Sequence, residues 1–125
     1  MAASREFIEF LTEQMAGFGP VSVRRMFSGA GVYRDDLIFA LIVGDTLYFK
    51  TDEESRGPFE AEGLGPFTYS TKKGEHKLTS YWRAPSRCFD DPDEMALWCR
   101  RAYDVALKVQ KAKSAKKKVK AARPR

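Results

Sequence analysis

Hydrophobic side chains recur at helical spacing near both ends of the chain and at strand spacing between them. In the first helical stretch the apolar positions are Phe7, Ile8, Leu11 and Met15. The hydroxyl of Ser4 can cap this helix, and Gly17 can supply a left-handed residue at its C-terminal end. We therefore predict an amphipathic helix between these two residues.

From Val21 onward the spacing is that of β-strands. We predict one long strand from Val21 to Tyr33, bent where Gly29-Ala-Gly31 interrupts it. Two further strands follow at 37–43 and 46–51, joined by short polar turns. The first of these two is apolar throughout, which is typical of a central strand. These segments predict an antiparallel meander.

The second half of the chain repeats the alternation of helix and strand. Residues 52–63 are acidic and predict a short helix, and 66–71 and 78–83 predict a hairpin with its turn at 72–77. The last helix begins with Asp91 at the N-cap and Pro92 after it. Its apolar stripe comprises Met95, Trp98, Ala102, Val105 and Val109. The predicted order is α-β-β-β-α-β-β-α, a two-layer α+β fold.

Basic residues are concentrated at the C-terminus. Nine of the 22 Lys and Arg residues lie in residues 108–125, a segment without Asp or Glu, which leaves 13 basic against 17 acidic side chains in residues 1–107. The nine are Lys108, Lys111, Lys113, Lys116, Lys117, Lys118, Lys120, Arg123 and Arg125. We expect a domain over residues 1–110 and a basic, disordered tail over 111–125, whose first part can extend the last helix.

The tail has two interpretations. Bound to nucleic acid, its cations would release counterions and bind without regard to sequence. Alternatively it only keeps the protein in solution.

Candidate chemistry elsewhere is sparse. Arg24 and Arg25 are candidates for an anion or partner contact, but neighbours on a strand point to opposite faces. The Gly-Ala-Gly between Gly29 and Gly31 opens no helix, so we interpret it as a close backbone approach and not as a phosphate loop. The single histidine, His76, is expected in an exposed turn, and Asp90, Asp91, Asp93 and Glu94 are explained by helix capping. We expect no catalytic residue, no metal and no cofactor.

Composition sets further expectations. Cys88 and Cys99 are expected to be reduced, buried thiols. The longest apolar run, 37–43, is too short to span a bilayer, and the N-terminus lacks the apolar core of a signal peptide, so we expect a cytoplasmic protein without membrane contact.

The second hairpin carries rings and cations together, namely Phe67, Tyr69, Tyr81 and Trp82 among Lys72, Lys73, Lys77 and Arg83. Such a set could stack bases of single-stranded nucleic acid. Phe67 and Tyr69 share a face, whereas Tyr81 and Trp82 point oppositely, so we expect at least half of these rings in the core.

Six segments occur in an order that matches a known family. They are Arg24-Arg-Met-Phe27, Gly29-Ala-Gly-Val-Tyr33, Phe39-Ala-Leu-Ile42, Thr46-Leu-Tyr-Phe-Lys50, Pro66-Phe-Thr-Tyr69 and Ser80-Tyr-Trp82. As a set they resemble the N-terminal domain of the TfoX/Sxy family of bacterial competence regulators. The resemblance covers about residues 5–107. It implies a five-stranded antiparallel sheet and a non-enzymatic role in transcriptional activation of DNA-uptake genes, alongside the cyclic-AMP receptor protein. It supplies no catalytic residue, and this chain has only the basic tail where longer members carry a second domain.

The leading hypothesis is therefore a regulatory, DNA-associated binding protein whose tail gives non-specific nucleic-acid affinity. Its partners would be nucleic acid, a protein such as a transcription regulator, and a second copy in a homodimer. A protein-interaction module with a merely solubilising tail is the first alternative. An enzyme acting on an anionic metabolite through Arg24 or Arg25 is the second.

Overall fold

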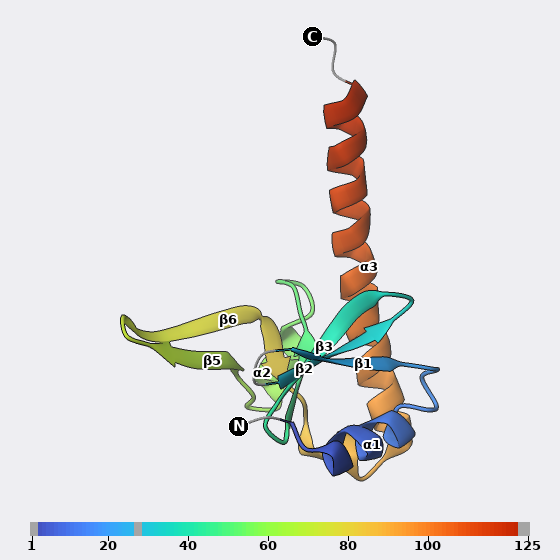
Figure 1. Cartoon of the computed structure of the whole chain (residues 1–125), viewed down its shortest axis with the longest axis vertical. Coiled ribbons are helices and arrows are strands. Elements are labelled where there is room, and N and C mark those ends of the chain that lie inside the picture. Colours follow the sequence, from blue (N-terminus) through green and yellow to red (C-terminus); the bar gives the residue numbers. More distant parts are fainter. Residues whose placement is uncertain (1–2, 27–28, 123–125) are drawn as a thin grey trace.

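A single antiparallel sheet of six strands, in the order β1-β2-β3-β4-β6-β5, forms one layer of the fold (Figure 1). The computed structural model describes residues 3–26 and 29–122, with side chains described up to residue 114. The strands are β1 (Ser22–Met26), β2 (Gly29–Arg34), β3 (Leu37–Val43), β4 (Thr46–Lys50), β5 (Pro66–Thr71) and β6 (Gly74–Arg83). The antiparallel α+β class is as predicted.

Helices form the other layer. They are α1 (Arg5–Gln14), α2 (Gly57–Ala61), the 3-10 turn η1 (Ser86–Phe89) and α3 (Pro92–Ala122). Their apolar sides meet one face of the sheet, and the largest side chains buried between the layers include Trp98, Phe39, Phe49, Leu11 and Met15. Burying such side chains is the main favourable contribution to folding.

The long first strand predicted over residues 21–33 is wrong. The segment forms two strands, β1 and β2, which pair antiparallel with Met26 opposite Gly29. The sheet therefore has six strands instead of five, and the order gains one strand before the second helix. The glycines did mark a special backbone position, but the position is the start of a new strand that packs closely against its neighbours.

The two glycines of this segment allow that close packing. A Cβ on Gly29 would lie 2.2 Å from the carbonyl oxygen of Ile42, across the β2–β3 pair. A Cβ on Gly31 would lie 2.7 Å from the Cε atom of Met26 and 2.9 Å from Cδ1 of Ile38. The predicted close backbone approach is confirmed.

The helix starts are close to prediction. The Ser4 hydroxyl accepts a hydrogen bond from the backbone N–H of Phe7 at 3.1 Å. A carboxylate oxygen of Asp91 accepts from the N–H of Asp93 at 2.9 Å, and Pro92 is the first residue of α3. The predicted left-handed residue at Gly17 is wrong, because α1 ends at Met15 as C-cap and the positive φ of 140° belongs to Gly19.

Two other boundaries differ from prediction. The second helix, α2, covers only Gly57–Ala61, because Gly57-Pro58 starts the helix instead of interrupting it. The second hairpin turns within Lys72–Lys73, and His76 therefore lies in β6 opposite Tyr69, not in a turn.

Alternation along the strands gives the sheet a second face, directed away from the helices. On β4, Leu47 and Phe49 are buried against the helices, so Tyr48 and Lys50 point the other way. Cross-strand partners share a face, which places Arg83 and Tyr81 of β6 beside them. We call this side of the sheet the open face.

The last helix continues well beyond the sheet (Figure 1). α3 runs to Ala122, so the last helix extends into the tail through residues 111–122. The abundance of Ala and Lys, both good helix formers, explains the continuation. The domain boundary near residue 110 stays a prediction. Within the described part of the chain, no helix combines the length and the apolar character needed to cross a bilayer.

Candidate nucleic-acid interface

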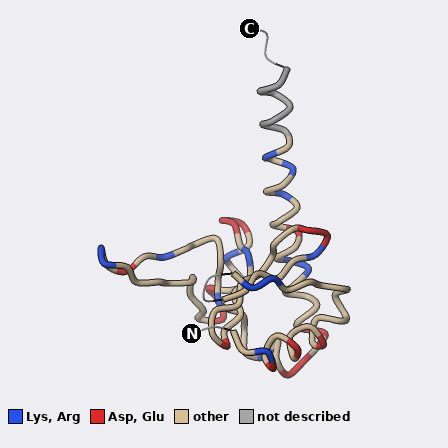
Figure 2. Tube along the Cα trace, viewed as in Figure 1, with Lys and Arg blue, Asp and Glu red and all other residues tan. Residues whose placement is uncertain are grey.

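Residues 108–125, which we call the basic segment, begin where α3 leaves the body of the protein. Val105 and Ala106 are buried, and Val109 and Gln110 still line a pocket against the sheet. Beyond them the exposed Lys111 starts a stretch of 12 helical residues to Ala122, about 18 Å long at 1.5 Å per residue. In Figure 2 the positions of Lys and Arg, blue on the Cα trace, recur along the described part of this projecting helix.

The first lysine of the segment is engaged with the body. Nζ of Lys108 lies 2.9 Å from Oδ2 of Asp52 and 3.2 Å from Oε2 of Glu54. The hydrogen bond from Lys108 holds the pKa of Asp52 below its ordinary value, and the same contact raises the pKa of Lys108. Lys108 therefore carries a charge that two carboxylates already compensate.

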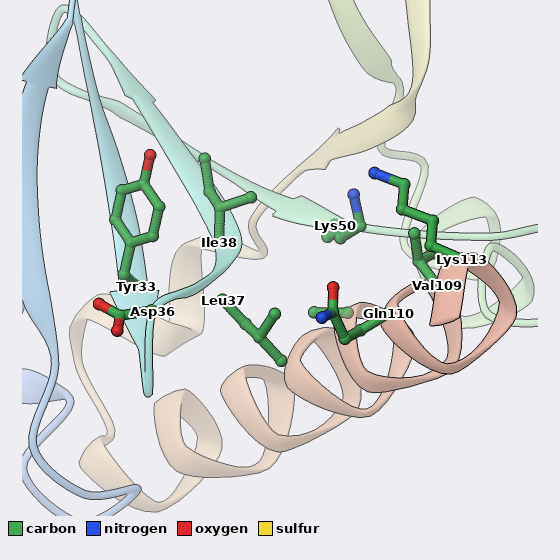
Figure 3. Close-up of a pocket in the computed structure, with 9 residues that line it drawn as sticks. Tyr33, Asp36, Leu37, Ile38, Lys50, Val109, Gln110 and Lys113 are labelled. Atoms are coloured by element: carbon green, nitrogen blue, oxygen red, sulfur yellow. The ribbon is translucent and has the colours of Figure 1, made fainter. Parts of the chain in front are cut away.

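Lys113 lies beside a second lysine that the sequence analysis missed. Both Lys113 and Lys50 line a pocket of about 170 Å³, and Figure 3 shows their amino groups extending to the same side. Burial, and then the charge of Lys113, lower the pKa of Lys50. The alternation of β4 could have placed Lys50 opposite the core, but nothing in the sequence brings it near α3.

Other members of the predicted set cannot be placed. Arg123 and Arg125 lie outside the described residues, as do the side chains of Lys116, Lys117, Lys118 and Lys120. Their assignment to nucleic-acid binding stays a prediction.

Arg24 and Arg25 point to opposite faces of β1, as expected. Nη2 of Arg24 lies 2.7 Å from Oδ1 of Asp36, and its guanidinium sits over the ring of Tyr33. Nη1 of Arg25 donates to the carbonyl oxygen of Ala3 at 2.9 Å. The structure does not bring these two residues together.

The aromatic hairpin divides as expected. Tyr81 is buried, and Trp82 packs against the core beside Phe59. Phe67 and Tyr69 share the open face, and the Tyr69 side chain is 45% exposed. Two of the four rings are thus part of the body, and two remain near solvent.

The remaining candidates have structural roles. His76 accepts from or donates to Oγ1 of Thr71 at 2.8 Å. Glu94 accepts from the indole N–H of Trp98 and pairs with Arg87. In residues 3–26 and 29–122, no three His, Cys, Asp or Glu side chains are grouped so that they could hold a metal ion.

The two cysteines are free and buried, as predicted. Burial raises the pKa of the Cys88 thiol to about 12. It raises the pKa of the Cys99 thiol as well. Both therefore stay protonated at neutral pH.

Comparison with known proteins places the chain in a family. No curated protein matches it. Residues 13–106 match the family described as the TfoX N-terminal domain, which covers the whole sheet, α2 and the buried part of α3. This span includes all six segments on which the resemblance was based. The chain therefore belongs to the TfoX N-terminal domain family.

Proposed function

We propose that this chain is a non-enzymatic regulatory protein that associates with nucleic acid through its basic segment. The observation that carries the proposal is the continuation of α3 beyond the body, with Lys111 and Lys113 exposed on it. A projecting basic helix can approach a phosphate backbone without a clash from the acidic body.

The charge distribution and the family support the same proposal. Residues 1–107 carry 17 acidic and 13 basic side chains, so the net positive charge of the chain lies at its C-terminal end. Members of a competence-regulator family act in the control of DNA-uptake genes, which makes DNA the first polyanion to test. We expect binding to be insensitive to sequence, since contacts to phosphates do not read bases.

A salt series tests the proposal. The full chain and a variant with Lys116, Lys117, Lys118 and Lys120 changed to Gln would be titrated against a fluorescein-labelled duplex by anisotropy. We expect the logarithm of the affinity of the full chain to fall steeply with the logarithm of salt, by about 0.9 per phosphate neutralised. The variant removes four of the nine cations of the basic segment, so it should lose about half of this slope and bind more weakly at every salt concentration.

Two results would contradict the proposal. Equal binding by both forms would place the duplex site on the body. If neither form binds the duplex at low salt, the basic segment only keeps the protein in solution.

A protein-interaction module is the second candidate, and two exposed apolar side chains on the helical layer favour it. Phe10 on α1 is 39% exposed and Leu97 on α3 is 44% exposed. The partner would be a transcription regulator or a second copy of the chain. Light scattering over a concentration series would detect a homodimer, and Leu97→Gln should weaken that dimer if this surface forms it.

An enzyme acting on an anionic metabolite has less support. Arg24 and Arg25 point apart and are each held by another group, so they cannot clamp one anion. The proposed role requires no cofactor.

A further inference from the structure

Four rings form a continuous row on the open face. The Tyr48 and Phe67 ring centroids are 5.0 Å apart in an edge-to-face contact. Phe67 and Tyr69 are stacked at 5.9 Å, and Tyr69 stacks on His76 of the neighbouring strand at 5.3 Å. We call Tyr48, Phe67, Tyr69 and His76 the aromatic row. It runs from the centre of the sheet onto the hairpin of β5 and β6, which projects from the body (Figure 1).

Cations border this row at both ends. Lys50 lies two residues from Tyr48 on the same strand face, and Arg83 lies opposite Tyr48 on β6. At the far end, the hairpin turns through the exposed Lys72 and Lys73.

The cations at the pocket end of this row have no acidic partner, whereas Arg24 and Arg87 of the body are paired with carboxylates. Among the described residues, no carboxylate lies within 4.0 Å of the charged atoms of Lys50, Arg83 or Lys113. Among the described residues that line the pocket of Figure 3, Asp36 alone carries a carboxylate, and it already pairs with Arg24. The open face thus presents uncompensated positive charge next to a row of rings of which Tyr69 is exposed and the other three are half-buried.

In the pocket between Lys50 and Lys113, two positive charges lie close together without an anion to compensate them. Two ammonium groups share a space of about 170 Å³, and the repulsion between them contributes to the lowered pKa of Lys50. Lys50 also sits over the ring of Tyr81, 5.1 Å from its centroid. An anionic group between the two lysines would relieve the repulsion, and a phosphate is small enough to enter.

We propose that the open face binds single-stranded nucleic acid, with bases stacked on the aromatic row and phosphates held by Lys50, Lys113 and Arg83. Exposed rings flanked by cations are the arrangement that single-strand binding requires, because every base has a face that can stack. A duplex keeps its bases stacked inside, where a sheet surface cannot reach them. This site shares Lys113 with the basic segment but adds the rings and cations of the sheet, and so goes beyond the proposed duplex contact.

Anisotropy with a fluorescein-labelled oligothymidylate of about 12 nucleotides, within the usual site size for such surfaces, tests the stacking part. We expect Tyr69→Ala to weaken binding by about fivefold or more, since one stacked base contributes that much. Phe10→Ala is the matched control, because it removes a similarly exposed ring from α1 on the helical layer. Circular dichroism would establish that both variants are folded.

Two charge variants on the sheet test the part of the proposal that concerns phosphates. Lys50→Gln should weaken binding of the oligonucleotide and reduce its salt slope by about 0.7. Lys77→Gln removes the same charge from β6 but on the reverse face. Lys77 is adjacent to His76, and a register irregularity of the β5–β6 pair separates this part of β6 from Tyr81 and Arg83. This variant should leave the slope close to that of the unchanged chain.

A third variant separates this proposal from the proposed function. Changing Lys116, Lys117, Lys118 and Lys120 to Gln leaves Lys113 and the open face intact, so binding of the oligonucleotide should persist while binding of the duplex falls. Loss of both would overturn the open-face proposal and leave the basic segment as the sole site. Equal affinities of the Tyr69→Ala and Phe10→Ala variants for the oligonucleotide would also overturn it. If the Tyr69→Ala substitution dissociates a dimer and leaves oligonucleotide binding unchanged, the open face is a dimer interface and the proposal is likewise overturned.

Discussion

The ammonium group of Lys108 lies 2.9 Å from a carboxylate oxygen of Asp52, a residue 56 positions earlier in the chain. The contact ties the start of the basic segment to the loop before α2. Because Asp52 and Glu54 already compensate its charge, Lys108 has little attraction left for an external phosphate.

We therefore predict that Lys108→Gln weakens duplex binding less than Lys111→Gln does. Lys111 is exposed on α3 and should contribute about 0.9 to the salt slope, whereas Lys108 should contribute clearly less. Anisotropy titrations of the two variants over the same salt series would measure the difference. Equal changes in slope would show that the basic segment binds with Lys108 released from its carboxylates.

The same pair predicts a dependence of stability on acid pH. The hydrogen bond from Lys108 holds the pKa of folded Asp52 below its ordinary value of 3.8. The resulting stabilisation is fully present above pH 4 and is lost as the pH falls through the folded pKa. Asp52→Asn should remove it, at a cost of less than about 1 kcal/mol at pH 7 because the pair is near solvent.

Urea unfolding of the Asp52→Asn variant and of the unchanged chain, at intervals of about half a pH unit between pH 2.5 and 6, would measure the difference in the free energy of unfolding. Glu53→Gln is the control, since Glu53 is exposed beside the pair. If Asp52→Asn lowers the free energy of unfolding equally at pH 3 and pH 6, the ionised Asp52–Lys108 pair is not the cause of the lost stability.

Gly29 should tolerate no side chain. The added Cβ of Gly29→Ala would lie 2.2 Å from the Ile42 carbonyl oxygen, and backbone on both strands would have to move. We expect the free energy of unfolding to fall by about 3 kcal/mol. Gly65→Ala is the matched control, because nothing lies within 4 Å of its Cβ position. Urea unfolding of both variants measures the difference, and equal stabilities would mean that the β2–β3 pair adapts at low cost.

Much of the fold follows from the sequence because its signals are local. The Ser4 and Asp91 caps depend on hydrogen bonds within three residues, and the sequence predicts both. The β1–β2 hairpin was missed because Val21 to Tyr33 looks like one strand unless the antiparallel pairing of Met26 with Gly29 is known. That pairing depends on β3, which supplies the surface against which the glycines pack.

The candidate site was less predictable because it depends on tertiary contacts. That Phe67 and Tyr69 share a face follows from alternation alone. The approach of Lys113 to Lys50 and of Lys108 to Asp52 depends on how α3 crosses the sheet, and side chains more than 50 residues apart carry no local signal of it.

The cysteines should be unreactive in the folded chain. Both side chains are fully buried, and burial raises the pKa of Cys88 to about 12. At pH 8 almost none of either thiol is the reactive thiolate. We expect Ellman's reagent to react slowly with the folded chain and quickly with both thiols in concentrated urea. Rapid reaction of one equivalent without denaturant would show that one cysteine opens to solvent.

Alkaline pH should destabilise the fold through buried groups that lose protons. Burial raises the pKa of Tyr81 to about 12 from its ordinary value of 10.0. Because the unfolded chain then gives up this proton at lower pH, the stabilisation is fully present below pH 10 and is lost as the pH rises through 12. Tyr81→Phe removes the ionising group but keeps the ring. Its free energy of unfolding should therefore fall less steeply above pH 10, by up to about 1.4 kcal/mol per pH unit.

Guanidinium unfolding of Tyr81→Phe across this pH range measures that slope, with Tyr69→Phe as the control. Tyr69 is 45% exposed, so its hydroxyl has no comparable burial and its variant should follow the unchanged chain. If Tyr81→Phe also follows the unchanged chain, the buried Cys88 and Cys99 thiols carry the alkaline loss, because their folded pKa values are raised in the same direction. If the stability does not fall at all above pH 10, these three groups are not buried in the folded protein.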